Sequence, residues 1–164
     1  MSAPRVQAPR CTECGAQAEI RAGSEVWPTR RDLWTKWAWV CPTEGCGAYC
    51  GCHGQTKIPL GRPAGHALRE ARIKLHARLD PIWREAPEGA AYAPESPRAR
   101  KMIQNRARTR VYAWLADWMG LTVDECHVAL FTIEQCRVAW RHIVSTNYDA
   151  IRDWAKAREG SKAA

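Results

Sequence analysis

The sequence contains no apolar run that approaches the roughly 18 residues needed to cross a bilayer, and its first residues, MSAPRVQAPRCTEC, contain no apolar signal region. The first absence excludes a membrane-spanning helix, so no membrane partner is expected. The second favours a cytoplasmic protein, in which free thiols stay reduced. Hydrophobic residues nevertheless make up 46% of the 164 residues, which is enough for a core and excludes a disordered chain.

The usual signatures of catalysis are also missing. The sequence has no phosphate-cradling glycine loop, no Ser-His-Asp order and no carboxylate cluster suited to Mg2+. One enzymatic alternative is a metal-assisted nuclease, in which His76 and Asp80 share a helix face and act with His53 or His66. The other interpretation of His76 and Asp80 is a local hydrogen bond or helix-end contact. We therefore favour a protein without catalysis and assign no catalytic residue.

Cysteines are present in an uneven pattern. There are eight, and six of them fall within residues 11–52. Such clustering in a reducing compartment indicates metal binding. Cys11 and Cys14 form a C-x2-C pair, and Cys41 and Cys46 form a wider pair with four intervening residues. Two close pairs predict a tetrahedral Zn2+ site of four thiolates, which has no open position and would fold the module without performing chemistry.

The stretch VCPTEGCGAYCGCHG leaves alternatives for the fourth ligand. Cys50, Cys52 and His53 follow the second pair closely. One of them could replace Cys46, or the three could begin a second metal site. The interpretation we favour is that they pack in a strand after the cysteine pair.

The predicted fold class is α+β, an N-terminal zinc-ribbon β module followed by a small helical domain. Among the 26 residues between the cysteine pairs, the stretches AEIRA and WTKWAWVC are predicted to form strands. The alternation in the second stretch places Trp37 and Trp39 on one face. The stretch REAPEGAAYAPESP is rich in proline, glycine and alanine and has no periodicity, which indicates a linker. The expected organisation is a zinc-ribbon-like module over 8–62, a basic amphipathic helix over 63–84, a linker over 85–97 and a helical domain over 98–158.

Helical periodicity is clear after residue 63. The first helix has an apolar stripe of Leu68, Ala71, Leu75, Leu79 and Ile82. The second begins with Ser96 as N-cap and Pro97 as its first residue, and Gly120 ends it. Its predicted buried side comprises Ile103, Ala107, Val111, Trp114, Leu115 and Trp118.

Two capping boxes follow the second helix. Thr122 with Glu125 predicts a short helix, and Thr132 with Gln135 predicts a longer one. The buried stripe of the longer helix is expected to be Ile133, Cys136, Trp140 and Ile143. The short helices are expected to close on Trp114, Trp118 and Trp140.

Positive charge is concentrated in the middle of the chain. Residues 63–110 carry 11 Lys and Arg against 5 Asp and Glu, whereas the whole chain has a net charge of +8. A basic helical surface suits a phosphate backbone, so the predicted partner is DNA or RNA. No base-reading set is apparent, and little sequence specificity is expected. The candidate phosphate contacts are Arg69, Arg72, Arg98, Lys101, Arg106, Arg108 and Arg110, and Trp37 and Trp39 could stack on bases if they are exposed.

The order of motifs resembles an uncharacterised zinc-finger-containing domain family of bacteriophages and prophage-bearing bacteria. The resemblance runs through CTECG, WVCPTEGCGAYCGCHG, PLG, LREARIKLHARLDPIW, YAWLADWMGL and ECHVALFTIEQC, within residues 11–140. It implies zinc bound by the N-terminal cysteines and a phage-type context, hence the cytoplasm of a host cell, and it supplies no activity. The wider CPTEGC pair departs from the family pattern at the fourth ligand.

A second possible function, besides nucleic-acid binding, is protein binding. A phage accessory protein would bind and modulate a host or defence protein. Tryptophan beside arginine is the composition that protein interaction hot spots use. The third alternative is the metal-assisted nuclease described above.

Overall fold

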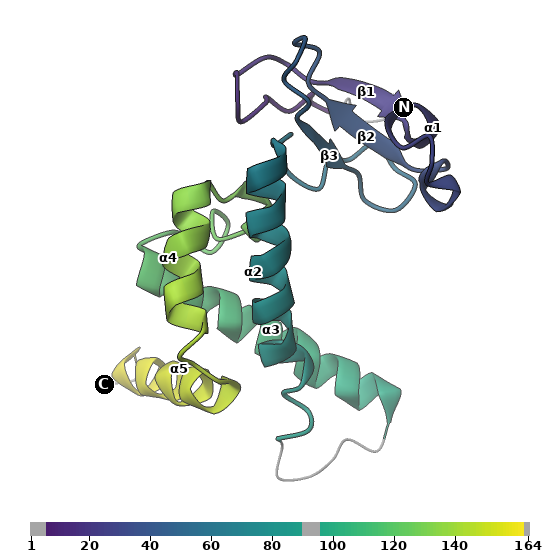
Figure 1. Cartoon of the computed structure of the whole chain (residues 1–164). Coiled ribbons are helices and arrows are strands. Elements are labelled where there is room, and N and C mark those ends of the chain that lie inside the picture. Colours follow the sequence, from purple (N-terminus) through teal and green to yellow (C-terminus); the bar gives the residue numbers. More distant parts are fainter. Residues whose placement is uncertain (1–5, 90–95, 163–164) are drawn as a thin grey trace, which may run out of the picture. The chain divides into compact units, whose positions relative to one another are not determined.

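A computed structural model describes residues 6–89 and 96–162 of the chain (Figure 1). The chain divides into two compact units, Met1–Glu70 and Ala71–Ala164, and the boundary falls inside helix α2 (His66–Arg84). The fold class is confirmed: an N-terminal antiparallel sheet carries a four-cysteine cluster, and helices follow. Within the predicted linker, residues 90–95 lie outside the described residues.

The first unit is built on a three-stranded antiparallel sheet in the order β1 (Glu19–Ala22), β2 (Trp37–Val40) and β3 (Tyr49–Gly51). Ile20 pairs with Trp39, which in turn pairs with Cys50. Successive side chains of a strand point to opposite faces. One face accordingly buries Trp39 against Ala18 and Cys52, and this cluster forms one part of the hydrophobic core of the unit.

The connection between β1 and β2 depends on a glycine. Helix α1 (Gly23–Val26) and the 3-10 turn η1 (Arg31–Leu33) form this connection. The Gly23 N–H donates to the Lys36 carbonyl at 2.8 Å, which closes the loop against the start of β2. A Cβ at position 23 would lie 1.9 Å from the Leu33 carbonyl oxygen, so only glycine fits without a backbone shift.

Gly23→Ala is expected to lower the free energy of unfolding of the first unit by about 1–3 kcal/mol, because the added methyl group overpacks against backbone. Thermal unfolding followed by tryptophan fluorescence measures the change. Gly89→Ala is the control, because no atom lies within 4 Å of a Cβ there. Equal stability of the two variants would contradict the steric argument.

The second unit contains the rest of α2, then α3 (Pro97–Met119), the 3-10 turn η2 (Val128–Leu130), α4 (Ile133–Ile143) and α5 (Tyr148–Lys162). The predicted ends of α3 are confirmed: the Ser96 hydroxyl accepts from the Ala99 N–H, and Gly120 takes a φ of 64°. The capping box of Thr132 and Gln135 opens α4. The fully buried side chains of this unit include Leu75, Leu79, Val111, Leu115, Val128, Phe131, Ile143 and Ile151.

Three details of the second unit differ from the sequence predictions. Thr122 and Glu125 make the reciprocal hydrogen bonds of a capping box, but the residues after Thr122 form a turn and not a helix. Trp118 and Trp140 were expected in the core, yet they are 56% and 41% exposed. Trp118 stacks on His142 at a ring distance of 4.8 Å. In α4 the inward positions are taken by Cys136, Ala139 and Ile143, so Trp140 lies at the edge of the buried stripe.

The interior of the second unit also contains a cation. The Arg72 side chain of α2 is buried, and its Nε and Nη2 donate to the Phe131 carbonyl at 3.0 and 2.8 Å. Phe131 follows η2 and precedes the N-cap of α4, so its carbonyl receives no helical hydrogen bond there. Arg72 therefore connects α2 to the segment that positions α4.

Arg72→Met is expected to lower the free energy of unfolding of the second unit by about 1.5–3 kcal/mol, because it removes a charge-assisted hydrogen bond from a buried carbonyl. Urea unfolding followed by circular dichroism at 222 nm measures this loss. The control is Arg78→Met, in which a half-buried arginine on the same helix gives up one long contact of 3.4 Å to the Val144 carbonyl. The prediction fails if the two variants unfold at the same urea concentration.

Within residues 6–89 and 96–162, no helix is both long and apolar enough to cross a membrane.

Candidate metal centre

The ends of the strands bring the four cysteines together. Cys11 and Cys14 lie in the turn that precedes β1, and Cys41 directly follows the last residue of β2. Cys46 lies in the turn between β2 and β3. The Cys41 N–H donates to the Ala48 carbonyl at 2.9 Å, which extends the pairing of β2 with β3 to the cysteine loop. The first residues of β1 and β3, Glu19 and Tyr49, both pair with Val40 at the end of β2, so the two cysteine turns meet at one end of the sheet.

The sulfur atoms have the spacing of a tetrahedral metal site. The Sγ atoms of Cys14 and Cys41 are 3.4 Å apart, those of Cys11 and Cys46 are 3.7 Å apart, and those of Cys14 and Cys46 are 4.0 Å apart. All four lie within 4.8 Å of one another. A tetrahedron with Zn–S bonds of 2.3 Å has edges of about 3.8 Å. The three distances bracket that value, so one ion can contact all four sulfurs.

Glycines shape the turns that aim the backbone at the sulfurs. Gly15, Gly45 and Gly47 take positive φ values of 76°, 74° and 61°. Residues with a Cβ rarely adopt this conformation, so glycine allows the chain to reverse within two or three residues of each pair. The Glu13 N–H donates to the Cys11 Sγ at 3.4 Å. Such hydrogen bonds stabilise negative charge on sulfur, which is the form in which cysteine binds a metal.

The thiols perturb one another strongly. The Thr43 hydroxyl, the Ala16 N–H and the neighbouring thiols lower the pKa of Cys14 to about 6. The Ala48 N–H favours the thiolate of Cys46, but burial and the other three thiols prevail and raise the pKa of Cys46 to about 12. Four sulfurs at these distances cannot all ionise without a compensating cation. A divalent ion supplies that charge.

The donor set fits Zn2+. Among the described residues, this is the one group of three or more Cys, His, Asp or Glu side chains whose ligand atoms converge on a single point, and all its donors are thiols. Four thiolates close the coordination shell, so the ion has no position for water or substrate. Zinc bound here links the turn before β1 to the turn after β2 and stabilises the first unit. The role of zinc in this site is structural.

Cys50, Cys52 and His53 lie apart from this cluster. The Cys50 thiol donates to the Gly61 carbonyl at 3.3 Å, and Cys52 is buried beside Trp39 and Ala18. His53 is exposed at a turn. The structure thus brings Cys46 to the other three sulfurs, and Cys50 and Cys52 pack in and after β3.

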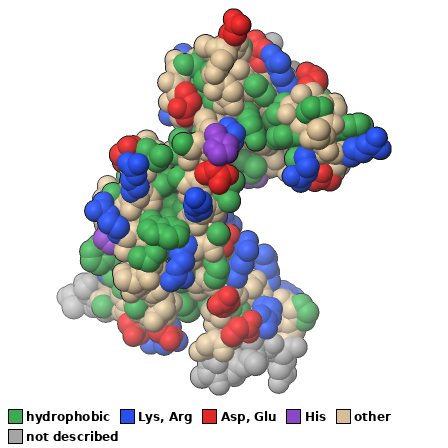
Figure 2. Space-filling view, in the orientation of Figure 1, with side chains coloured by type: hydrophobic (Ala, Val, Ile, Leu, Met, Phe, Trp, Pro, Cys, Tyr) green, Lys and Arg blue, Asp and Glu red, His purple; other side chains and the backbone are tan. Residues whose placement is uncertain are grey.

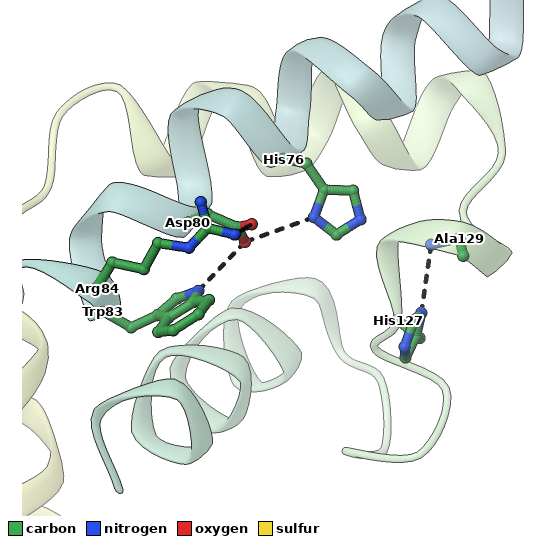
Figure 3. A network of polar contacts seen from close by, with 6 residues as sticks. All are labelled: His76, Asp80, Trp83, Arg84, His127 and Ala129. Carbon is green, nitrogen blue, oxygen red and sulfur yellow. Dashed lines mark hydrogen bonds and ion pairs between the residues drawn. The ribbon is translucent and has the colours of Figure 1, made fainter. Parts of the chain in front are cut away.

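The pair of His76 and Asp80 forms a local network on α2 (Figure 3). His76 Nδ1 is 3.5 Å from an oxygen of Asp80. The same carboxylate accepts from Trp83 Nε1 at 3.2 Å and from Arg84 Nη2 at 3.0 Å. These donors satisfy the carboxylate with groups of its own helix, and no second carboxylate joins it among the described residues. The contacts account for the pair without a metal or a substrate.

Two of the predicted nucleic-acid contacts are buried. Trp39 is 7% exposed, and its Nε1 donates to the Lys57 carbonyl at 2.9 Å. Arg72 is 8% exposed and is held by the Phe131 carbonyl. Neither side chain can reach a polyanion, because both belong to the packed interior. Trp37 is half-buried, and the Lys57 ammonium lies 4.5 Å from its ring centroid.

Three more predicted contacts have local partners. The Arg69 guanidinium lies 3.9 Å from the Tyr49 ring centroid. Arg108 lies 5.6 Å from the Tyr112 ring centroid, and Arg110 donates to the Tyr148 hydroxyl at 3.1 Å. The remaining candidates on α3 are exposed: Arg98, Lys101 and Arg106.

Comparison with known proteins gives a match to a protein family. No curated protein and no solved structure matches the chain. The model of one protein family, described as a zinc-finger-containing domain, matches residues 7–146, which include the four cysteines and most of each unit. With most of its length matched and its four thiols in place for zinc, the chain belongs to the DUF3268 zinc-finger-containing domain family.

Proposed function

We propose that this protein binds nucleic acid without catalysis, through the basic surface of α3, while zinc serves only to fold the first unit. The observation that carries the proposal is the charge composition of α3. From Pro97 to Ala116 the helix contains six Lys and Arg and no Asp or Glu. Such a surface attracts a polyanion by counterion release, which requires no base-specific contact.

Three of these cations are free to contact phosphate. Arg98, Lys101 and Arg106 are exposed, and no carboxylate lies within ion-pair distance of them in the part of the chain that is described. At 100° per residue they fall within an arc of about 140°, over a helix length of about 12 Å. One side of α3 can therefore present all three to a single nucleic-acid backbone.

Arg100 and Arg108 contribute less to this surface. Arg100 forms a two-point ion pair with Glu88 at 2.6 and 3.1 Å, which neutralises its charge. Arg108 is held beside the Trp83 and Tyr112 rings. We expect these two arginines to fix the start of α3 and the end of α2 rather than to contact phosphate.

The experiment that tests the proposal is a fluorescence-anisotropy titration of the zinc-loaded protein against labelled single-stranded DNA, duplex DNA and RNA. With three phosphate contacts, affinity should fall about 20- to 40-fold between 50 and 200 mM salt. The polymer with the highest affinity identifies the class of partner. Affinity that does not change over this range would contradict the proposal, because phosphate contacts must release counterions.

The cellular setting belongs to the same proposal. The eight cysteines are outside disulfides, and a four-thiolate site requires that its own four cysteines stay reduced. This favours the cytoplasm. The sequence resemblance to phage and prophage proteins supports the cytoplasm of a bacterial host.

A further inference from the structure

The second unit has a groove that contains no residue of α3 and therefore lies outside the surface proposed above. It lies between α2 and α4, has a volume of about 590 Å3, and is lined by Ala71, Lys74, Cys136, Arg137, Trp140 and Arg141. Figure 2 shows hydrophobic side chains over α4, with Lys and Arg side chains around them. The groove therefore combines an apolar floor with a basic rim.

Trp140 differs from the other exposed tryptophans. Trp34 donates its Nε1 to the Trp27 carbonyl and lies beside Arg31, and Trp118 stacks on His142. Trp140 is 41% exposed, and among the described residues its indole has neither a hydrogen bond nor a ring partner. An indole that is both exposed and without a ring partner is available to stack on another planar group.

The charged side chains that line the groove have one sign. Lys74, Arg137 and Arg141 line the groove, and no carboxylate lines it. The ion pair of Arg137 is with Glu134, over 3.9 Å and with both side chains more than 70% exposed, so water screens it strongly. Arg137 and Arg141 are four residues apart and lie on the same face of α4 as neighbours. The groove thus offers charge complementarity to an anionic chain at two successive points beside Trp140.

We propose that this groove binds single-stranded nucleic acid, with an unpaired base stacked on Trp140 and the adjacent phosphates held by Lys74, Arg137 and Arg141. The inference rests on the proposed function and names the polymer: a strand whose bases are not already stacked in a duplex. Stacking tolerates every base, because each has a π face. This agrees with the absence of a base-reading helix.

A single strand fits this groove better than an acidic peptide for a geometric reason. The apolar feature is the one flat indole of Trp140. Two cations flank it on the same helix: Arg137, three positions before it, and Arg141, directly after it. A nucleotide pairs one planar base with one phosphate, so its repeat matches this arrangement. An acidic peptide would need an aromatic or aliphatic side chain placed on the indole between two of its carboxylates to use the same surface, and it is treated as an outcome of the test.

The test compares Trp140→Ala with Trp118→Ala in anisotropy titrations against a labelled twelve-nucleotide oligothymidine and a duplex of the same length. Trp140→Ala should weaken binding of the single strand about 5- to 100-fold and leave duplex binding unchanged. Trp118→Ala removes an indole that is more exposed than Trp140, at 56% against 41%, but lies outside the groove, and it should change single-strand affinity by less than about twofold. Trp140→Phe keeps an aromatic face and should restore most of the affinity. Thermal unfolding confirms that each variant is folded.

The outcomes separate the two proposals. If Trp140→Ala binds the single strand as the unchanged protein does, the groove is not a base site, while binding through α3 still stands. If single-strand and duplex affinity fall together, Trp140 has a structural role and the inference is wrong. If the zinc-loaded protein binds no nucleic acid, both proposals fail. Displacement of the oligonucleotide by poly-glutamate at equal ionic strength would also overturn the inference in favour of an acidic peptide.

Discussion

Cys41→Ser is expected to abolish zinc binding and to unfold the first unit. Cys41 is buried in the small cluster with Cys11 and Ala48, and its Sγ lies 3.4 Å from that of Cys14. Serine is a poor ligand for Zn2+ beside three thiolates, so the closed tetrahedral site is lost. Structural zinc sites contribute about 10–16 kcal/mol of apparent binding free energy, which is folding free energy for a module of this size.

The size of the effect follows from the small core of the first unit. Its sheet has strands of three or four residues, and the buried cluster beside it comprises, among the described residues, only Ala18, Trp39 and Cys52. A sheet this short does not bury enough apolar surface to be stable alone. The ion joins the turn before β1 to the turn after β2, and removing it releases both ends of the sheet.

The measurement is zinc content by mass spectrometry or atomic absorption, together with the dispersion of amide signals by NMR. The unchanged protein should hold one zinc per chain, and Cys41→Ser should hold less than about a tenth of that. Cys50→Ser is the matched control: its thiol contacts the Gly61 carbonyl and a hydroxyl can do the same, so full zinc content is expected. A Cys41→Ser protein with one tightly bound zinc would show that other ligands hold the ion.

The sequence was sufficient to predict this site because cysteine spacing is a local property. Two close pairs, each followed by glycine, can be recognised without knowledge of the sheet that joins them. The helix ends at Ser96, Gly120 and Thr132 could be predicted for the same reason, since a cap is satisfied by atoms three or four residues away. The choice of Cys46 over Cys50 required the register of β2 against β3, which depends on pairing between segments.

Burial in the second unit could not be predicted as well. Periodicity identifies the apolar side of α4, but it does not tell which of Ala139 and Trp140 faces the core. The structure buries the smaller residue, which lets α4 pack closely, and leaves the indole at the edge of the groove. Arg72 shows the converse error: an arginine in a basic run is expected outside, but the Phe131 carbonyl holds it inside. Both outcomes depend on neighbours that lie far away in the sequence.

The triple variant Arg98→Ala, Lys101→Ala, Arg106→Ala is expected to lose about 100- to 1000-fold in affinity for nucleic acid at 0.1 M salt. Each phosphate contact contributes about 0.9 to the slope of log affinity against log salt for duplex DNA. Removing three contacts should therefore reduce that slope by about 2.7, which corresponds to a loss of this size at 0.1 M salt. The exposed position of all three side chains makes a large effect on stability unexpected.

The matched control removes the same number of charges from cations that are already ion-paired: Arg21, Arg30 and Lys156, whose partners are Glu19, Asp32 and Asp153. Both triple variants lower the net charge from +8 to +5, since each loses three positive charges. If net charge alone attracted the polyanion, the two variants would weaken binding equally. A loss confined to the α3 variant, with the reduced salt slope, would locate the contacts on α3. An α3 variant that keeps both the affinity and the slope of the unchanged protein would show that its cations form a solvated face, and the phosphate contacts would then have to lie elsewhere on the protein.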